Sequence, residues 1–281
     1  MTERVNNIKL NSVESTDLKE TRLSIQINLD GFSFCIYSLS EKKPIVFQRF
    51  NFEEKASTPE RHLAQIENIF FENEFLKESF ERVTIIHQNE LSSLVPTELF
   101  DKNHLKDYIK NSVKTLPIDY LSYDNIDSIN ATTVYIPFVN INNFFLNYYG
   151  SFEYYHSFTQ LAILLTKEDL TNSNDKIFVH VNQNSFELLA FKKNKLQVIN
   201  KFDFLTAEDF IYYVLFVVEQ LSFDCETLNL ILLGDIQKES ELFAIIYKYI
   251  RNIKFYTNTI KRPIEFNEIP KHSNFILLNQ Y

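Results

Sequence analysis

The sequence predicts an α/β protein built from two similar units, because the order strand, strand, strand, helix, strand can be read twice along the chain. In the first half these elements are expected at residues 23–29, 32–38, 44–52, 59–74 and 82–87, and in the second half at 177–183, 185–191, 195–204, 206–221 and 228–233. The spacing of matching positions is nearly constant: 152 residues from Asn28 to His180, 148 from Thr58 to Thr206 and 147 from Ile85 to Leu232. Such constant offsets indicate a duplicated unit.

The first two strands form an expected hairpin. Apolar residues alternate from Leu23 to Leu29 and again from Phe32 to Ile36, on either side of Asp30-Gly31. Because Asp-Gly favours the primed turns of two-residue hairpins, we expect the turn at this dipeptide. The helix at 59–74 is predicted by a capping box in 57–60 with a proline near its first position, and a similar box at 206–209 predicts the second helix.

The sequence around and between the two units suggests further elements. Residues 1–20 are polar and predict a mobile or edge-lying arm, 21–168 a first lobe with an insertion at about 95–140, and 169–281 a second lobe shortened at its C-terminus. The insertion is expected to hold a helix near 104–113 and strands near Tyr120 and 134–136. Further elements are expected as helices at 142–149 with Gly150 as C-cap, 158–170 linking the lobes and 239–251, and as strands at 152–156, 254–256 and 275–278.

Composition excludes several classes of protein. With 28 Lys and Arg against 37 Asp and Glu the formal net charge is −9, and the basic residues are scattered, so we expect no nucleic-acid binding. The first 20 residues lack the apolar segment of a signal peptide and no 18 consecutive residues are apolar, which predicts a cytoplasmic protein without membrane insertion. Cys35 and Cys225 lie far apart and are interpreted as core thiols rather than a redox or zinc motif.

Glycine is scarce. At about 7% of an average protein, roughly 20 glycines would be expected, yet the chain has only Gly31, Gly150 and Gly234. Loops that bring backbone amides close to a phosphate depend on glycine. The composition therefore argues against a glycine-built phosphate site.

The duplicated order and spacing over residues 22–281 resemble the superfamily of actin, hexokinase and the heat-shock chaperone ATPases. More closely, the chain resembles an uncharacterised bacterial family with this actin-like ATPase fold, akin to pilus-assembly actin-like homologues. The resemblance implies duplicated ribonuclease H-like units forming two lobes with a central cleft. It also implies that three loops would hold Mg-ATP.

Each of the three loops departs from the family pattern. The first phosphate loop resembles I-x-I-D-x-G-T-[TS], but here Asn28 replaces the carboxylate, Asp30 stands where the glycine belongs, and Phe32 lies at a hydroxyl position. A shift of one or two residues would restore Asp30-Gly31 at the cost of the strand's polar face. The tight Asp-Gly turn is therefore the plainer interpretation.

The second phosphate loop and the adenosine loop are similarly altered. The second resembles D-x-G-G-G-T, where this chain has His180 for the carboxylate and bulky amides at Asn182, Gln183 and Asn184. The adenosine loop resembles a hydrophobic residue followed by Gly-Gly at the end of a strand; this chain keeps Gly234 but has Asp235 in place of the second glycine. At an effective dielectric near 20, a like charge about 4 Å from an anionic ligand costs on the order of 4 kcal/mol.

Other chemistry has weaker support. His180, beside Asn28, Asp30 and Asp235, could act as a base or ligand, or be a hydrogen-bonded structural histidine, and the remaining histidines show no ligand spacing. Common nucleophile, zinc and P-loop motifs are absent from the sequence, and we expect no metal site.

Several surface features leave alternatives open. The aromatic run 142–158 is either a docking surface or packing between lobes, and Val95-Pro96 with Leu99-Phe100 either contacts a partner or begins a helix. Lys192, Lys193 and Lys195 are interpreted as a solvated hairpin tip. The arm at 1–20 is either solvated or folds onto a partner.

These features favour a non-catalytic actin-like module that binds an unidentified protein, with no cofactor and a degenerate cleft at Asn28, Asp30, Gly31, His180, Asn182, Asn184, Gly234 and Asp235. The alternative is an ATP-binding actin-like protein or kinase-like ATPase that holds Mg-ATP in an altered pose through Asp30, Asp235 and His180. A small-molecule sensor is the third hypothesis. The pathway, the partner and the oligomeric state stay open.

Overall fold

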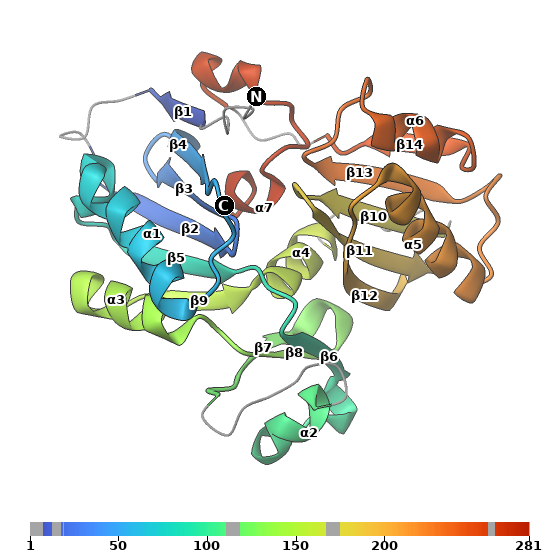
Figure 1. The fold of residues 1–281 in the computed structure, drawn as a ribbon, viewed down its shortest axis with the longest axis horizontal. Coiled ribbons are helices and arrows are strands. Elements are labelled where there is room, and N and C mark those ends of the chain that lie inside the picture. The colour runs from blue at the N-terminus through green and yellow to red at the C-terminus, as the bar shows by residue number, and fades with distance from the viewer. Residues whose placement is uncertain are drawn as a thin grey trace. The chain divides into compact units, whose positions relative to one another are not determined.

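The computed structural model describes residues 8–12, 18, 20–110, 119–166, 175–257 and 262–280. The chain divides into two compact units (Figure 1). The first comprises the described parts of residues 1–161, 260–268 and 276–281, and the second those of 162–259 and 269–275. Within the described residues, no helix has the length and apolar character that spanning a membrane requires.

The first unit is built on a six-stranded sheet in the order β1-β4-β3-β2-β5-β9. Strands β1 to β4 pair antiparallel, whereas β2, β5 and β9 run parallel. β1 lies at the edge of the sheet, so this part of the N-terminal arm is an edge strand. The bounds are β1 Ile8–Asn11, β2 Thr21–Asn28, β3 Gly31–Ser38, β4 Lys43–Asn51, β5 Arg82–His87 and β9 Glu153–His156.

Two helices bury their apolar faces in the core of this unit. In α1 (Pro59–Glu72), the Thr58 side chain caps the first turn by accepting a hydrogen bond from the Arg61 amide. The helix and its early proline are as predicted, but the N-cap is Thr58 and not Ser57 of the expected box. α3 (Val139–Tyr149) ends at Gly150, whose φ of 76° confirms the predicted C-cap. The two helices meet through Phe70 of α1, whose ring contacts Phe144 and Tyr148 of α3.

The insertion forms a small sheet of its own in the order β6-β8-β7. Its bounds are β6 Ser92–Pro96, β7 Ser122–Ile126 and β8 Ala131–Tyr135, beside a short helix α2 (Leu105–Ile109). Of the two alternatives for Val95-Pro96, a helix start is wrong, because these residues end β6 and a single 3-10 turn, Thr97–Leu99, follows. Residues 111–118, which include the end of the expected helix, lie outside the described residues.

The second unit repeats the first. Its sheet has the order β12-β11-β10-β13-β14, which matches β4-β3-β2-β5-β9, and its first three strands are antiparallel and its last three parallel. The duplication is therefore confirmed strand by strand. The bounds are β10 Lys176–Val181, β11 Ser185–Lys192, β12 Lys195–Asp203, β13 Asn229–Gly234 and β14 Asn252–Phe255.

The helices of the second unit are α5 (Ala207–Gln220) and α6 (Glu241–Tyr247). α5 begins with the predicted capping box, in which the Thr206 side chain accepts from the Asp209 amide while the Asp209 side chain accepts from Thr206. Its apolar face packs on β10, β11 and β13. α4 (Ser157–Thr166) contains the point of the chain, between residues 161 and 162, at which the two units divide. Residues 167–170 of the expected linking helix lie outside the described residues.

The strand expected at 275–278 is wrong. These residues form a short helix, α7 (Phe275–Leu278), all four of which are buried. A short apolar run buried on every side carries no periodicity that separates a strand from a helical turn. For such a run only its length and its flanking residues can distinguish a strand from a helix, and here they favoured the wrong one.

The hairpin turns also differ from the expectation. Asn28 pairs with Gly31, so the two turn residues are Leu29 and Asp30 rather than Asp30 and Gly31. None of these residues has a positive φ, which excludes the expected primed turn. A turn with positive φ at both central residues occurs instead at Lys193 (48°) and Asn194 (64°), which join β11 to β12.

The lysines at that second turn are not all solvated. Lys192 donates a hydrogen bond from Nζ to the Leu221 carbonyl at 2.6 Å, and the same nitrogen lies 5.6 Å from the centre of the Phe223 ring. The interpretation of a solvated tip is therefore wrong for Lys192. Lys195 is exposed, as expected.

Candidate functional site

The first candidate loop is the tip of the β2–β3 hairpin, where Asn28, Asp30 and Gly31 lie together. Its backbone carbonyls are held by its neighbours: the Phe52 amide donates to Asp30 O at 2.8 Å and the Ala56 amide to Leu29 O at 3.3 Å. Gly31 is packed closely, since a Cβ there would lie 3.0 Å from Phe50 O and 3.1 Å from Asn28 Oδ1. Packing within the sheet therefore favours glycine here.

His62 of α1 closes this tip. Its Nε2 lies 2.9 Å from the carbonyl oxygen of Asn28, so the imidazole donates its Nε2 hydrogen to that acceptor. Burial lowers the pKa of His62 below its usual value, while the hydrogen bond to Asn28 and the nearby Asp30 carboxylate act in the opposite direction. The side chain is 2% exposed, and it packs edge-on against Phe52 and Phe138.

The second candidate loop is the tip of the β10–β11 hairpin. The Asn182 amide donates to Ser185 O at 2.8 Å, which leaves Gln183 and Asn184 as the exposed turn residues. The Phe204 amide in turn donates to Asn184 O at 3.0 Å. None of residues 182–184 has a positive φ, so the backbone is not curled as a glycine-built loop would be.

The structure places Asn182, rather than His180, at the position equivalent to Asn28. Ile27 and Val181 are the last residues of their strands to pair with the neighbouring parallel strand, with His87 and Gly234 as partners. Asn28 and Asn182 follow them directly. The spacing between equivalent positions at the hairpin tips is thus 154 residues, not the 152 that relate Asn28 to His180.

His180 is held inside the second unit by a carboxylate. Its Nδ1 lies 2.8 Å from Glu187 Oε2, and the two side chains are 4% and 0% exposed. The residues are directly opposite each other on β10 and β11. Sequence reasoning missed Glu187, although a two-residue turn at 183–184 would by itself have paired positions 180 and 187.

The third candidate loop follows β13 at Gly234. Its backbone is fully engaged: the Gly234 amide donates to His272 O at 2.7 Å, and Ser273 Oγ donates to Gly234 O at 3.2 Å. Gly234 has a φ of 81°, and a Cβ there would lie 2.1 Å from Val181 O. The next amide, of the exposed Asp235, donates to Val181 O at 2.7 Å.

The segment 272–273 was not expected at this loop. His272 also reaches back, with Nε2 2.7 Å from Ile236 O, so the imidazole donates to that carbonyl. No sequence pattern pointed to this contact, because it joins residues that are 36 positions apart through an irregular segment. The segment occupies the polar groups with which Gly234 could have met a ligand.

Two side-chain atoms at these loops stand out. Asn28 Oδ1 and Asn182 Nδ2 are both buried and have no hydrogen-bond partner among the described residues. Buried amide atoms normally find a partner in protein or water. Elsewhere in the described chain, no group of three or more His, Cys, Asp and Glu side chains is arranged to hold a metal ion.

Comparison with solved structures identifies the fold. The chain is similar to a protein of Bacteroides thetaiotaomicron with an actin-like ATPase fold and unknown function, at 23% identity and a TM-score of 0.78 over 90% of this chain and 96% of that one. It is also similar to a chain of the PilM-PilN type IV pilus biogenesis complex, at 10% identity and a TM-score of 0.53 over 84% and 88%. The chain therefore has the predicted actin-like ATPase fold.

The family follows from the sequence itself. A family described as "Protein of unknown function (DUF3822)" matches residues 11–253, and the chain belongs to this family. This confirms the predicted kinship with an uncharacterised family of actin-like fold. None of the curated proteins matches the chain.

Proposed function

We propose that this protein is a non-catalytic actin-like module that binds another protein and whose nucleotide loops no longer hold phosphate. The observation that carries the proposal is the state of Gly234. Its amide and its carbonyl are both taken by residues 272–273, and its φ and tight contact with Val181 explain why glycine is kept. A glycine kept for its own sheet needs no nucleotide to explain it.

The hairpin tips support the same proposal. Phosphate loops present free backbone amides around small residues, whereas here side chains of Asn28 and Asn182 stand at the two equivalent positions and His62 covers the first tip. Gly31 is accounted for by its contact with Phe50. Asp30 and Asp235 would add negative charge beside a triphosphate.

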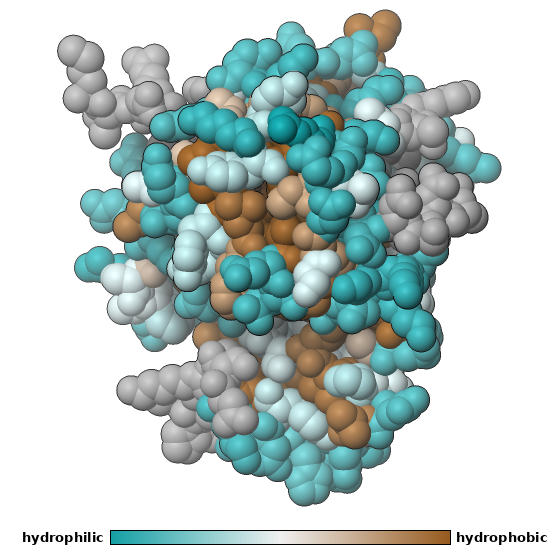
Figure 2. All heavy atoms as spheres, turned by 90° about the vertical axis from the view of Figure 1, so that its right-hand side faces the viewer, coloured by the Kyte–Doolittle hydropathy of each residue, from teal (hydrophilic) through white to brown (hydrophobic). Residues whose placement is uncertain are grey.

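Exposed aromatic side chains on the second unit support a role in protein binding. Tyr212 and Phe216 of α5 are 62% and 45% exposed with stacked rings, and Tyr247 of α6 is 63% exposed. Figure 2 shows hydrophobic side chains gathered on the face it presents, surrounded by hydrophilic ones. Surfaces of this kind often mark interaction sites. The PilM-PilN type IV pilus biogenesis complex includes a chain of similar fold, which supports a role in binding another protein.

A nucleotide titration tests the proposal. Mg-ATP at about 100 times its dissociation constant would stabilise the folded state by roughly 2.7 kcal/mol, which corresponds to several degrees in melting temperature for a chain of this size. We expect no shift with Mg-ATP or Mg-ADP relative to Mg²⁺ alone. We also expect that a partner protein, once purified, forms a complex with this purified chain in the absence of nucleotide.

The alternative function is an ATP-binding protein with an altered phosphate site, favoured by the unpartnered amide atoms of Asn28 and Asn182. It predicts a melting shift that Asp30→Ala or Asp235→Ala abolishes, while the exposed control Asp203→Ala preserves it. That result would overturn the proposed function. A complex that assembles only with ATP would overturn it as well.

A further inference from the structure

Strand β12 forms one edge of the sheet in the second unit (Figure 1). It spans nine residues, and no strand among the described residues pairs with its outer side. A long edge strand presents a row of unpaired N–H and C=O groups with which another chain can pair. The duplicated first unit shows how such an edge is covered in this fold.

The equivalent strand of the first unit, β4, has its outer side covered. β1 pairs with it antiparallel, with residues 8–11 opposite residues 46–49. β1 joins β4 next to a register shift in the β3–β4 ladder, and the β11–β12 ladder has a shift at the corresponding place, after Ala190. This irregularity does not prevent a strand from adding to β4, so it is no obstacle at β12.

One hydrogen bond fixes the correspondence between the two strands. The Phe52 amide donates to Asp30 O at 2.8 Å in the first unit, and the Phe204 amide donates to Asn184 O at 3.0 Å in the second. Counting back from these amides, the part of β4 that pairs with β1 corresponds to residues 198–201 of β12.

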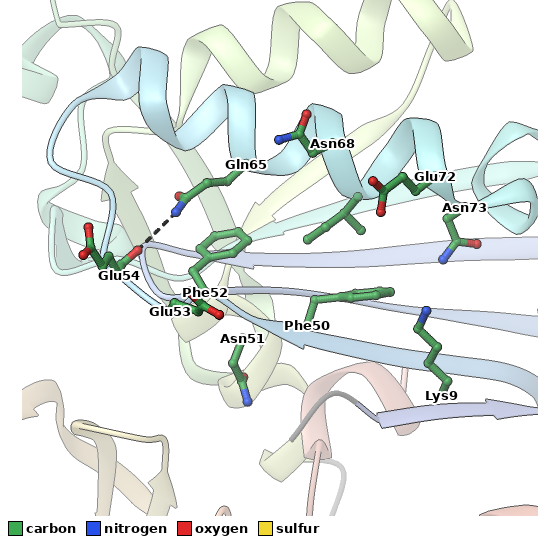
Figure 3. A pocket seen from close by; sticks show the side chains of 11 residues that line it. Lys9, Phe50, Asn51, Phe52, Glu53, Glu54, Gln65, Asn68, Glu72 and Asn73 are labelled. Carbon is green, nitrogen blue, oxygen red and sulfur yellow. Dashed lines mark hydrogen bonds between the residues drawn. The ribbon is translucent and has the colours of Figure 1, made fainter. Parts of the chain in front are cut away.

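The side chains at this edge differ in the way that a missing strand predicts. Lys9 of β1 covers Phe50 of β4, with its Nζ 5.2 Å from the centre of the ring (Figure 3). Phe50 is buried, whereas its counterpart on β12, Phe202, is only half-buried. An added strand would cover Phe202 as β1 covers Phe50.

The backbone groups of β12 alternate between β11 and the outer side. The Phe204 amide bonds to β11, so the groups of Phe202 and Asn200 face β11 as well. Those of Ile199 and Lys201 face outward. The Lys201 amide donates to Asn200 Oδ1 at 2.9 Å, and because Asn200 is exposed, an incoming strand can displace its side chain from this amide.

The sequence of β12 is complementary to itself in one antiparallel register. When Asn200 lies opposite Asn200 of a second copy, Val198 lies opposite Phe202 and Ile199 opposite Lys201. Val198 and Phe202 are half-buried and pack against the core of the second unit. Apolar cross-strand pairs stabilise a sheet, so this register covers apolar surface that a single copy leaves exposed.

Charge and strand geometry favour the same register. No two like charges lie directly opposite each other in it, and Lys201 keeps its own ion pair with Asp203, at 3.0 Å. Moving the centre of the pairing to Lys201 would place two ammonium groups opposite each other, which is unfavourable. Moving it to Ile199 would bring the irregular position Gln197 into the pairing.

We propose that two copies of this chain pair through β12, antiparallel about a two-fold axis at Asn200, and form one continuous sheet from both second units. Ile199 and Lys201 exchange backbone hydrogen bonds with the second copy, and the two Asn200 side chains meet at the axis. The interface is small, so the dimer dissociates in the micromolar range. The inference goes beyond the proposed function, because it requires neither a nucleotide nor another kind of protein.

Sedimentation velocity of the full chain, from micromolar to near-millimolar concentration, tests the pairing. We expect an equilibrium between monomer and dimer, and slower hydrogen exchange of the Ile199 and Lys201 amides as the dimer forms. The amides of β14, at the opposite edge of the same sheet, should exchange at an unchanged rate. A chain that stays monomeric at every concentration would overturn the proposal and leave this edge to an extended segment of another protein.

A charge at the axis tests the register. Asn200→Asp keeps an oxygen that can accept from the Lys201 amide, but it places two carboxylates opposite each other in the dimer. The dissociation constant should rise by about tenfold or more, and Asn200→Lys should have a similar effect. The exposed control Gln237→Glu makes the same change in charge outside β12 and should leave dimerisation unchanged.

Mixing the two variants tests the two-fold axis. Equal amounts of Asn200→Asp and Asn200→Lys should form a mixed dimer, because opposite charges then meet at the axis. A dimer as stable in Asn200→Asp as in the parent would show that another surface pairs, and it would overturn the proposal. Absence of the mixed dimer, while both variants keep the melting temperature of the parent, would overturn it as well.

Discussion

At the scale of single residues, the two glycines of the candidate loops are explained by their own surroundings. Gly31 has no positive φ and is favoured by the close approach of Phe50 O, whereas Gly234 combines a positive φ with an even closer approach of Val181 O. Gly150 provides a third case, with a positive φ and nothing within 4 Å of an added Cβ. Scarcity of glycine thus leaves each remaining one with a structural reason.

Gly234→Ala and Gly150→Ala form a matched pair. Both substitutions place alanine in a disfavoured backbone conformation, at about 1–3 kcal/mol each. Gly234→Ala adds a collision with the Val181 backbone, which should lower the free energy of unfolding by about 1–3 kcal/mol more. Urea denaturation measures both values. Equal losses for the two variants would contradict the steric explanation for Gly234.

At the scale of elements, one buried carboxyl joins the insertion to the main sheet of the first unit. Asp124 of β7 accepts hydrogen bonds from Tyr135 of β8, from the backbone amide of His156 in β9 and from Thr159 of α4, at 3.0, 2.8 and 2.9 Å. Burial raises the pKa of Asp124 to about 6, although these three donors act to lower it.

Asp124 therefore predicts a pH dependence of stability. A raised pKa in the folded state means that its contribution is greatest below pH 4 and is lost as pH rises to about 6, by on the order of 3 kcal/mol. In Asp124→Asn this contribution is absent. The free energy of unfolding of the variant relative to the parent should therefore increase between pH 4 and 6 and stay constant above.

The effect of His87 on the pH dependence of stability is opposite in sign to that of Asp124, so the variant must be compared with the parent at each pH. Burial lowers the pKa of His87 to about 3, so the folded protein loses stability as pH falls below 6.5. Its ring donates from Nε2 to Asn142 Oδ1 and accepts at Nδ1 from the Phe138 amide. Because both proteins carry His87, the difference between them reports Asp124 alone. A difference in the free energy of unfolding between variant and parent that stays constant from pH 4 to 7 would contradict the assignment of the pH dependence to Asp124.

At the scale of the whole molecule, the two units share one strand order, but the first unit also contains a segment from the end of the chain. The first unit includes residues 276–281, which follow the second unit in the sequence. Three of these residues, in α7, are at most 1% exposed. The first unit therefore completes its fold only when the last described segment is in place.

Leu278→Ala tests this dependence. Removing a buried leucine side chain should cost about 2–5 kcal/mol, whereas Leu205→Ala, at a side chain that is 93% exposed, should cost little. Hydrogen exchange then locates the effect, and amides of β2 and β5 in the first unit should lose protection. Loss confined to β10 and β13 would contradict the division into units.

Local patterns were sufficient for most elements because they depend on neighbouring residues. Alternation from Leu23 to Ile36, the capping residues Thr58 and Thr206, and the C-cap Gly150 all act within a few positions of the chain. The repeat of such patterns at constant spacing was enough to predict the duplicated fold. The exceptions were short segments, such as 275–278, where too few residues carry a period.

By itself the sequence determined the duplicated actin-like fold, the departure of its loops from the family pattern and the scarcity of glycine. Only the tertiary structure decided what those loops contact. It places the first hairpin turn at Leu29 and Asp30, and it pairs His180 with Glu187. It also shows that His272 and Ser273 hydrogen-bond to the backbone of Gly234. Gly234 and residues 272–273 are distant in the sequence, so no local pattern encodes their contact. The two hairpin contacts are local, but they depend on the register of each turn, which packing of the whole sheet decides.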